Sequence, residues 1–295
     1  MGIIINQDLR IELSSFTSLS SPDEAGALID KSGFHLDILF CIFRNDISTN
    51  NLNETYKCAG AIFKERGSIS FRCSLFDKCK YTSGINNKGG NAAYLISANT
   101  STDNVLVTKC AETESGDAPI RSLRPGESYF RAINMTDDHG TADWGNGAFE
   151  IVGYGPAVKI NYCQFCASSG GRTMYYGESE LAVMHSVFYN NTNEKYLFEF
   201  IGKMIFTFCC FKGNSNYEIS GREGQREIVF QQCNSDNSAA IPNADSFDSY
   251  CILSTYESIL QRLQRTKRYQ RTKRYQKFNL RLLSVFLFST TSDIE

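Results

Sequence analysis

Residues 181–188 read Leu-Ala-Val-Met-His-Ser-Val-Phe, and residues 204–211 read Met-Ile-Phe-Thr-Phe-Cys-Cys-Phe. Both follow one pattern: apolar, any, apolar, any, any, small or Cys, any, and then Phe. The shortest interval between copies is 23 residues, a period typical of a solenoid. The pattern occurs nine times, and its small or Cys position, called here the centre position, falls at Ser14, Cys41, Ser74, Cys110, Ile133, Cys163, Ser186, Cys209 and Cys233.

The positions around each centre indicate a strand. Two apolar residues that are separated by one variable residue precede the centre, for example Leu181 and Val183. This alternation is a strand signal, because neighbouring side chains in a strand point to opposite faces. The two residues between the second apolar position and the centre predict a bend or bulge that keeps the centre side chain inward. In six copies Phe stands two residues after the centre, at Phe16, Phe43, Phe76, Phe165, Phe188 and Phe211.

A second short apolar run precedes most copies and predicts a further strand in each turn. These runs are rich in aromatic and small residues and have no helical period. The sequence therefore predicts an all-β fold, a right-handed parallel β-helix solenoid of about nine coils. A leucine-rich repeat solenoid is the alternative, although the inward positions hold Ile, Val, Phe and Cys. The second runs cover residues 25–28, 59–63, 92–96, 147–151, 174–176 and 196–200.

Stacking of such turns predicts a rod on the order of 40 Å long, since neighbouring parallel strands lie about 4.8 Å apart. Equivalent side chains then form ladders. Buried cysteines behave as small apolar groups, and parallel side chains do not naturally reach disulfide geometry, so we expect most of the 11 cysteines to be reduced. The predicted structural ladder comprises Ser14, Cys41, Ser74, Cys110, Cys163, Ser186, Cys209, Cys233 and the six Phe residues Phe16, Phe43, Phe76, Phe165, Phe188 and Phe211.

Two further motifs carry a family resemblance. The stretch Ala-Gly-Ala-Ile ends at Ile62, and Phe-x-x-Asn occurs at residues 188–191 and 211–214. With the strand pattern, they resemble the right-handed parallel β-helix of pectin-lyase-like proteins, over residues 9 to 240. More narrowly, the chain is similar to polymorphic surface and outer-membrane-type β-helix repeat proteins of bacteria and parasitic protists. The resemblance implies a cell-surface or extracellular location.

Charge divides the chain into two parts. The net charge is −2, but residues 262–281 contain nine Lys or Arg and no acid. We predict a β-helix over residues 1–255 and a basic tail, helical or disordered, over 256–295. The hexapeptide Arg-Thr-Lys-Arg-Tyr-Gln occurs twice in this tail, which could contact an anionic membrane weakly. The sequence shows no signal-peptide pattern, and the apolar stretch 280–288 is too short to span a bilayer.

One acidic cluster is a candidate catalytic site. Carbohydrate-active lyases and hydrolases of the pectin-lyase-like architecture gather acids on one groove, and an aromatic ring beside acids could stack on a sugar. No second acidic pair falls at the matching position of adjacent coils, so an enzyme is the alternative rather than the main hypothesis. The cluster comprises Asp137, Asp138, His139 and Asp143, with Trp144 beside them.

The main hypothesis is therefore a non-enzymatic, adhesin-like binding or display protein. Cys163 and Cys166 lack a second pair at metal-ligand spacing, so no metal is expected, and no motif indicates a cofactor. Glycans or host and cell-surface proteins are the expected partners, and nucleic acid is disfavoured. Outward residues and loop inserts would contact them. These inserts are predicted at residues 44–58, 80–92, 112–127 and 136–147.

Overall fold

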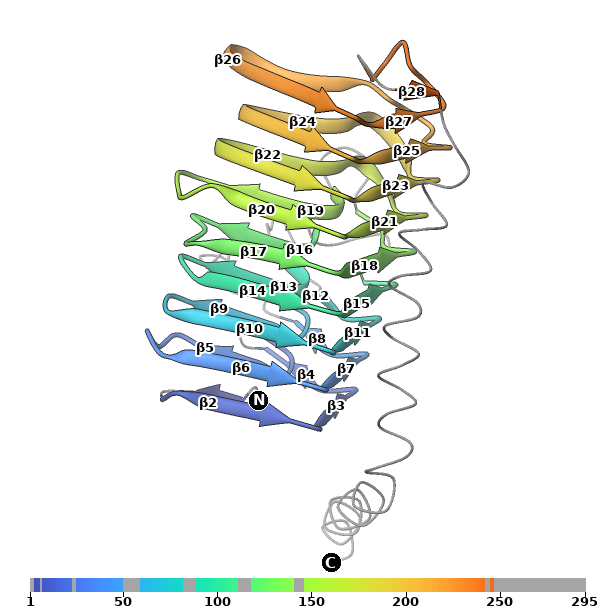
Figure 1. Cartoon of the computed structure of the whole chain (residues 1–295). Helices are drawn as coiled ribbons and strands as arrows, with labels where there is room; N and C mark the ends of the chain where they lie inside the picture. Colours follow the sequence, from blue (N-terminus) through green and yellow to red (C-terminus); the bar gives the residue numbers. More distant parts are fainter. Residues whose placement is uncertain are drawn as a thin grey trace, which may run out of the picture. The chain divides into compact units, whose positions relative to one another are not determined.

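The alternating apolar pattern forms strands that stack as a parallel β-solenoid, as the computed structural model shows (Figure 1). The structure describes residues 3–5, 7–22, 25–49, 59–81, 89–110, 118–140, 146–241 and 245–246. The chain divides into two units, residues 1–255 and 256–295. All described residues belong to the first unit, so the predicted basic tail lies outside them.

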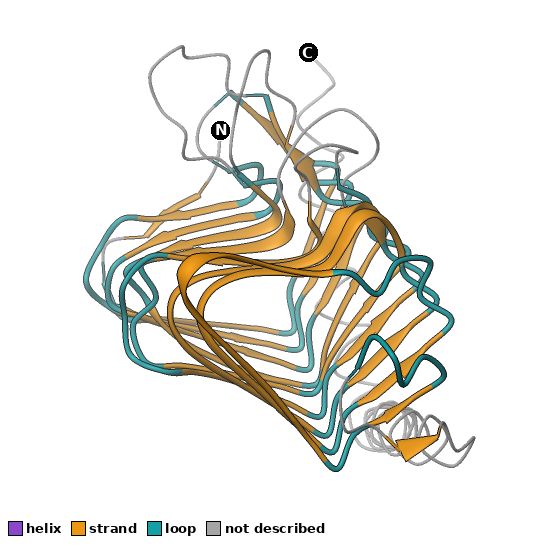
Figure 2. Ribbon diagram, turned by 90° about the horizontal axis from the view of Figure 1, so that it is seen from above, coloured by secondary structure: helices purple, strands orange, loops and turns teal. Residues whose placement is uncertain are grey.

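Each turn presents three faces, which Figure 2 shows end-on. First-face strands are β1 (Ile3–Ile5), β5 (Leu28–Asp30), β9 (Ile62–Glu65), β13 (Gly90–Ile96), β16 (Ala118–Leu123) and β19 (Asn146–Val152). The strands that carry the repeated pattern, called motif strands, are β2 (Leu9–Glu12), β6 (His35–Leu39), β10 (Ser68–Arg72), β14 (Asn99–Asp103), β17 (Ser128–Arg131) and β20 (Val158–Asn161).

In the last turns the first-face and motif strands join into long, curved strands (Figures 1 and 2). These are β22 (Ser169–Met184), β24 (Thr192–Thr207) and β26 (Ile219–Gln231). Strands on the third face are β3 (Ser15–Thr17), β7 (Ile42–Arg44), β11 (Leu75–Asp77), β15 (Val105–Thr108), β18 (Ile133–Thr136), β21 (Gln164–Cys166), β23 (Val187–Tyr189), β25 (Cys210–Lys212), β27 (Asn234–Ser235) and β28 (Asp245–Ser246). A small third sheet contains β4 (Ser20–Ser21), β8 (Ile47–Ser48) and β12 (Lys80–Tyr81).

The fold class predicted from the pattern is confirmed, with a smaller number of turns. The solenoid has about seven turns rather than about nine. The motif is counted nine times, but its first and last copies, in β2 and β26, each pair with a motif strand on one side only. The described residues contain no helix. Four of the runs predicted as second strands lie within strands, and the runs 25–28 and 59–63 lead into β5 and β9. The leucine-rich repeat alternative therefore does not hold.

The fourth copy of the pattern was placed one strand too late, which is a correction to the predicted ladder. Ile69 pairs with Thr100 and Phe71 with Thr102, while Val105 pairs with Ile133. Val105, and not Cys110, is therefore the centre of the fourth copy. The misplacement has a simple cause. Residues 105–110 read Val-x-Val-x-x-Cys and satisfy the pattern by themselves, whereas the two inward residues of the fourth motif strand are threonines, which the apolar pattern does not detect.

The predicted bend before each centre is confirmed. The residue directly before the centre has a left-handed backbone with φ between 48° and 57°, where non-glycine residues are uncommon. The left-handed conformation turns the chain between the motif strand and the third-face strand, so that the centre side chain points inward again. This first row of corners comprises Leu13, Phe40, Cys73, Asn104, Ala132, Tyr162, His185, Phe208 and Gln232.

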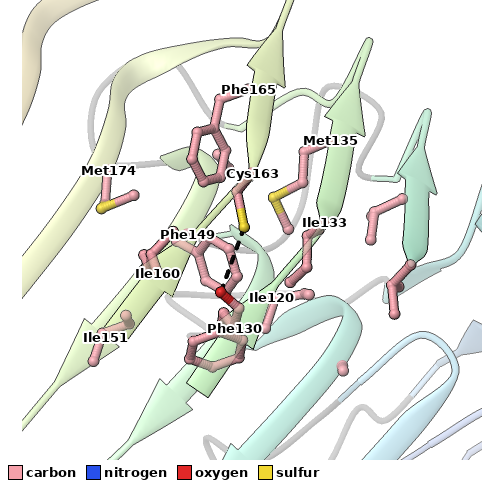
Figure 3. Close-up of a cluster of buried hydrophobic side chains, with 14 of the residues drawn as sticks. Ile120, Phe130, Ile133, Met135, Phe149, Ile151, Ile160, Cys163, Phe165 and Met174 are labelled. Carbon is pink, nitrogen blue, oxygen red and sulfur yellow. Dashed lines mark hydrogen bonds between the residues drawn. The ribbon is translucent and has the colours of Figure 1, made fainter. Parts of the chain in front are cut away.

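A continuous apolar core fills the solenoid. In the middle turns Phe130, Phe149 and Phe165 are fully buried, and their rings contact one another in tilted or edge-on pairs. Figure 3 shows this cluster, with the Cys163 thiol pointing toward the backbone oxygen of Phe130. Burial of these side chains is the main favourable contribution to folding.

Candidate functional site

A second row of left-handed corners follows the third face. In seven turns the residue after the corner points inward, whereas Leu19, after the corner at Ser18 in the first turn, is 37% exposed. We call these inward residues the corner row. They are Asp46, Cys79, Cys110, Asp138, Ser168, Asn191 and Asn214, and each directly follows a residue with positive φ. All seven are buried. The corner row matters because it contains Asp138, the central residue of the predicted catalytic cluster.

Asp138 lies inside the solenoid. Its side chain is 0% exposed, and its Oδ1 accepts a hydrogen bond of 2.7 Å from the backbone N–H of Cys110. Burial raises the pKa of this carboxyl well above its usual range. A carboxyl in this position supports the backbone of the preceding turn and is shielded from a substrate in solution.

The neighbours of Asp138 are arranged differently. Asp137 occupies the left-handed corner, with φ of 55°. His139 lies beside Ser169 of the next turn, and its Nδ1 is 2.5 Å from Ser169 Oγ. Asp143 and Trp144 fall outside the described residues. Within the part of the chain that the structure describes, the predicted cluster is therefore divided between a buried corner and a His–Ser contact.

The two asparagines of the Phe-x-x-Asn motif complete the corner row. The Oδ1 of Asn191 accepts the N–H of Ser168 at 3.1 Å, and its Nδ2 donates to the Phe165 carbonyl at 3.0 Å. Asn214 makes the equivalent bonds to the Asn191 N–H and the Phe188 carbonyl, both at 3.1 Å. Each amide thus satisfies one donor and one acceptor of the turn before it. The sequence showed the motif, but this function of the amide was not predicted.

The centre positions also bond to the backbone, beyond the filling of the core that was predicted. The Ser186 hydroxyl accepts the N–H of Cys163 at 3.1 Å, and the Cys163 thiol donates to the Phe130 carbonyl at 3.6 Å. Burial raises the pKa of the Cys163 thiol to about 12, so this cysteine stays protonated and unreactive at neutral pH. The row mixes Ser, Cys, Val and Ile and is not a row of cysteines alone.

Among the residues that the structure describes, eight cysteines are free thiols, including those at the centre positions 41, 163, 209 and 233. Cys210 is also buried, and it is disulfide-bonded.

The predicted Phe positions stack where Phe occurs on adjacent turns. The ring centroids of Phe16 and Phe43 are 4.9 Å apart, and those of Phe43 and Phe76 are also 4.9 Å apart. The stack is interrupted by Val107 and Met135, which occupy the equivalent positions. It resumes with Phe165, Phe188 and Phe211, at separations of 4.8 and 5.1 Å.

The predicted inserts occupy one place in the order of the strands, and the described residues that flank this place are called here the insert edge. Residues 50–58, 82–88, 111–117 and 141–145 lie outside the described residues, and each follows the third-face side of a turn and precedes a first-face strand. The described residues that flank them stack in register, since Ala25 bridges Ala59, and Ala59 bridges Gly90. The remaining residues of the four predicted loops are largely strands, including β8, β12 and β16.

On the outer surface of the motif strands, polar side chains of adjacent strands bond to one another. Asp37 bonds Arg72 at 2.6 Å and also accepts from the Ser70 hydroxyl. Partial burial raises the pKa of Asp37, but the Ser70 and Arg72 hydrogen bonds outweigh it and lower the pKa below its usual value. His185 is stacked between Tyr162 and Phe208, with centroid distances of 4.9 and 5.0 Å. Neither group presents an open catalytic arrangement.

No set of three or more His, Cys, Asp or Glu side chains among the described residues comes together to hold a metal ion. In the same residues, no helix is long and apolar enough to cross a membrane. Neither the protein-family models nor the curated proteins compared with the chain match it.

Proposed function

We propose that the protein is a non-enzymatic binding or display protein, in which the solenoid is a rigid support and the insert edge contacts the partner. Glycans, or proteins of a cell surface, are the proposed partners. This proposal extends the resemblance to pectin-lyase-like surface proteins, and a cell-surface or extracellular location belongs to it.

One observation carries the proposal: in four successive turns, a segment of five to nine residues separates the third-face side of the turn from the next first-face strand. The later turns lack such segments, because the corner residues Ser168 and Asn191 lead directly into β22 and β24. Loops on a rigid support are where binding residues concentrate in proteins, and repeat proteins bind along one face. Inserts that share an edge would therefore act together as a single contact surface.

The proposal can be tested with a glycan array, followed by analysis of any bound sugar. We expect binding without cleavage. Replacing residues 82–88 and 111–117 by short Gly-Ser turns should abolish binding without lowering the melting temperature. The matched control is Lys159→Ala, an exposed change on β20 away from the insert edge, which should bind as the wild type does.

Two outcomes would contradict the proposal. Binding that survives removal of the inserts would place the contact surface elsewhere. Shortened chains or unsaturated sugar ends would instead indicate the alternative, a carbohydrate-active enzyme that uses the region of Asp137 and His139. In that case Ser169→Ala, which removes the hydroxyl beside His139, should reduce turnover while binding remains.

A further inference from the structure

Asp46 and Asp138 occupy the same row as Asn191 and Asn214, and one oxygen of each makes the same hydrogen bond. Asp46 Oδ1 accepts the N–H of Leu19 at 3.0 Å, and Asp138 Oδ1 accepts the N–H of Cys110 at 2.7 Å. Both side chains belong to residues that are 0% exposed. At both aspartates, Oδ1 thus accepts the same backbone hydrogen bond that the side-chain oxygen accepts at Asn191 and Asn214.

The second side-chain atom differs between the asparagines and the aspartates. In Asn191 and Asn214 the second side-chain atom is an N–H donor that bonds a carbonyl of the preceding turn. In Asp46 and Asp138 the second atom, Oδ2, is buried and has no hydrogen-bond partner in the structure. By register, the equivalent carbonyls belong to Phe16 and Val107. An ionised carboxylate could only accept, and it would repel a carbonyl oxygen.

We propose that Asp46 and Asp138 are protonated in the folded protein and act as equivalents of asparagine, with Oδ2–H donating to the backbone carbonyl of the preceding turn. A protonated carboxyl has one acceptor oxygen and one O–H donor, which matches the two functions of the amide. The proposal rests on the fold and does not depend on the proposed binding function.

A third residue type in the row supports this assignment. Cys79 also donates to the preceding turn, from its thiol to the Phe43 carbonyl at 3.5 Å. An amide and a thiol thus both donate to the preceding turn from this row, whereas Cys110 and Ser168 donate to the Thr108 and Cys166 carbonyls of their own turns. Burial raises the pKa of Asp46 to about 7 and that of Asp138 well above its usual value.

Burial outweighs the backbone hydrogen bonds that lower the pKa of each carboxyl, from Leu19 and Arg44 at Asp46 and from Cys110 and Thr136 at Asp138. Cys79 is the titratable side chain that faces Asp46 from the next turn, and no charged side chain of the described residues contributes to the shift in its pKa. Cys110 faces Asp138 from the preceding turn, Ser168 lies on the next turn, and the adjacent Asp137 raises the pKa of Asp138 further. Neither aspartate has a cation beside it among these groups.

The consequence is a solenoid that is more stable in mild acid. Both carboxyls have folded pKa values above the unfolded value of 3.8. Their stabilising contribution is fully present below that unfolded value, and for Asp46 it is lost as the pH rises through about 7. Asp46 lies four residues before the insert at 50–58, and Asp138 lies three residues before the insert at 141–145. The base of these two inserts is therefore the part that alkaline pH loosens.

The test is thermal unfolding of the full chain, with the variants Asp46→Asn and Asp138→Asn, at about pH 5 and about pH 8. Each substitution should raise the melting temperature at the higher pH by roughly 3 °C and change it little at the lower pH. Asp103→Asn is the matched control, because Asp103 lies on the surface near Arg131. It should show no gain at the higher pH.

A reciprocal variant keeps the test decisive. Asn191→Asp should unfold as the wild type does at about pH 5 and several degrees lower at about pH 8, because it places a titrating donor in the same row. A loss of stability in Asp46→Asn at both pH values would overturn the proposal. The proposal would also be overturned if the melting temperature of the wild-type protein did not decrease from about pH 5 to about pH 8.

Discussion

At the scale of single residues, the corner row determines how one turn is attached to the next. Asn214 accepts the N–H of Asn191, donates to the Phe188 carbonyl, and accepts a second bond of 2.9 Å from the side-chain amide of Asn191. Removing this side chain leaves buried donors and an acceptor without partners. Such groups carry a desolvation cost that exceeds the net gain from the original bond.

We therefore expect Asn214→Ala to lower the free energy of unfolding by about 2–3 kcal/mol, measured by urea titration. The matched control is Asn99→Ala, which removes an exposed amide at the start of β14 and should have little effect. Equal losses in the two variants would mean that the amide in the corner row has no special function.

The same row shows where sequence reasoning reached its limit. Residues 137–139 contain two acids and a histidine, so residue types alone indicate a catalytic cluster. The left-handed corner at Asp137 turns Asp138 inward, and residue types alone do not show that corner. The Phe-x-x-Asn motif would have located the row, because Asp138 stands three residues after Met135, as Asn191 stands three after Phe188.

At the scale of the strands, side-chain contacts between turns fix the register. Phe188 on β23 contacts Phe165 and Phe211 on adjacent turns and Phe198 and Phe206 on β24, with centroid distances between 4.8 and 6.0 Å. A ring with four aromatic neighbours has little room to relax. Its removal leaves a cavity that the surrounding strands cannot close.

Phe188→Ala should accordingly lower the free energy of unfolding by about 3–5 kcal/mol. Phe208→Ala is a useful comparison, because Phe208 is 46% exposed and its loss should cost much less. Chemical denaturation followed by circular dichroism measures both. If the exposed ring proved as costly as the buried one, packing between turns would not control stability.

The strand pattern predicted most elements, because alternation and apolar identity agree in seven of the nine copies, and the fifth copy departs only at Ser128. In the fourth copy the inward residues are Thr100 and Thr102, whose hydroxyls bond to backbone carbonyls. Threonine is ambiguous in an apolar pattern, and the valines of the next strand fitted better. The strand β16 was also missed, since Pro119 and Arg121 interrupt its apolar run.

At the scale of the whole solenoid, each turn contacts only its neighbours. Stability in such folds is approximately a sum of turn and interface contributions, and the end turns are the first to open. We expect amide hydrogens of β10, β14 and β17 to exchange slowest, and those of β2 and β3 to exchange faster. Hydrogen exchange with mass spectrometry measures this gradient. Uniform protection along the stack would indicate a single all-or-none unit instead.

Because Ala25, Ala59 and Gly90 remain in register whatever number of residues lies between turns, a gene for this chain can gain or lose codons at that edge without shifting any strand pairing. A one-residue insertion within a strand would instead expose the buried side chains of that strand. Length variation should therefore accumulate at this edge rather than within the strands. Duplication of the sequence of one complete turn, between equivalent positions of adjacent turns, would add one turn to the solenoid.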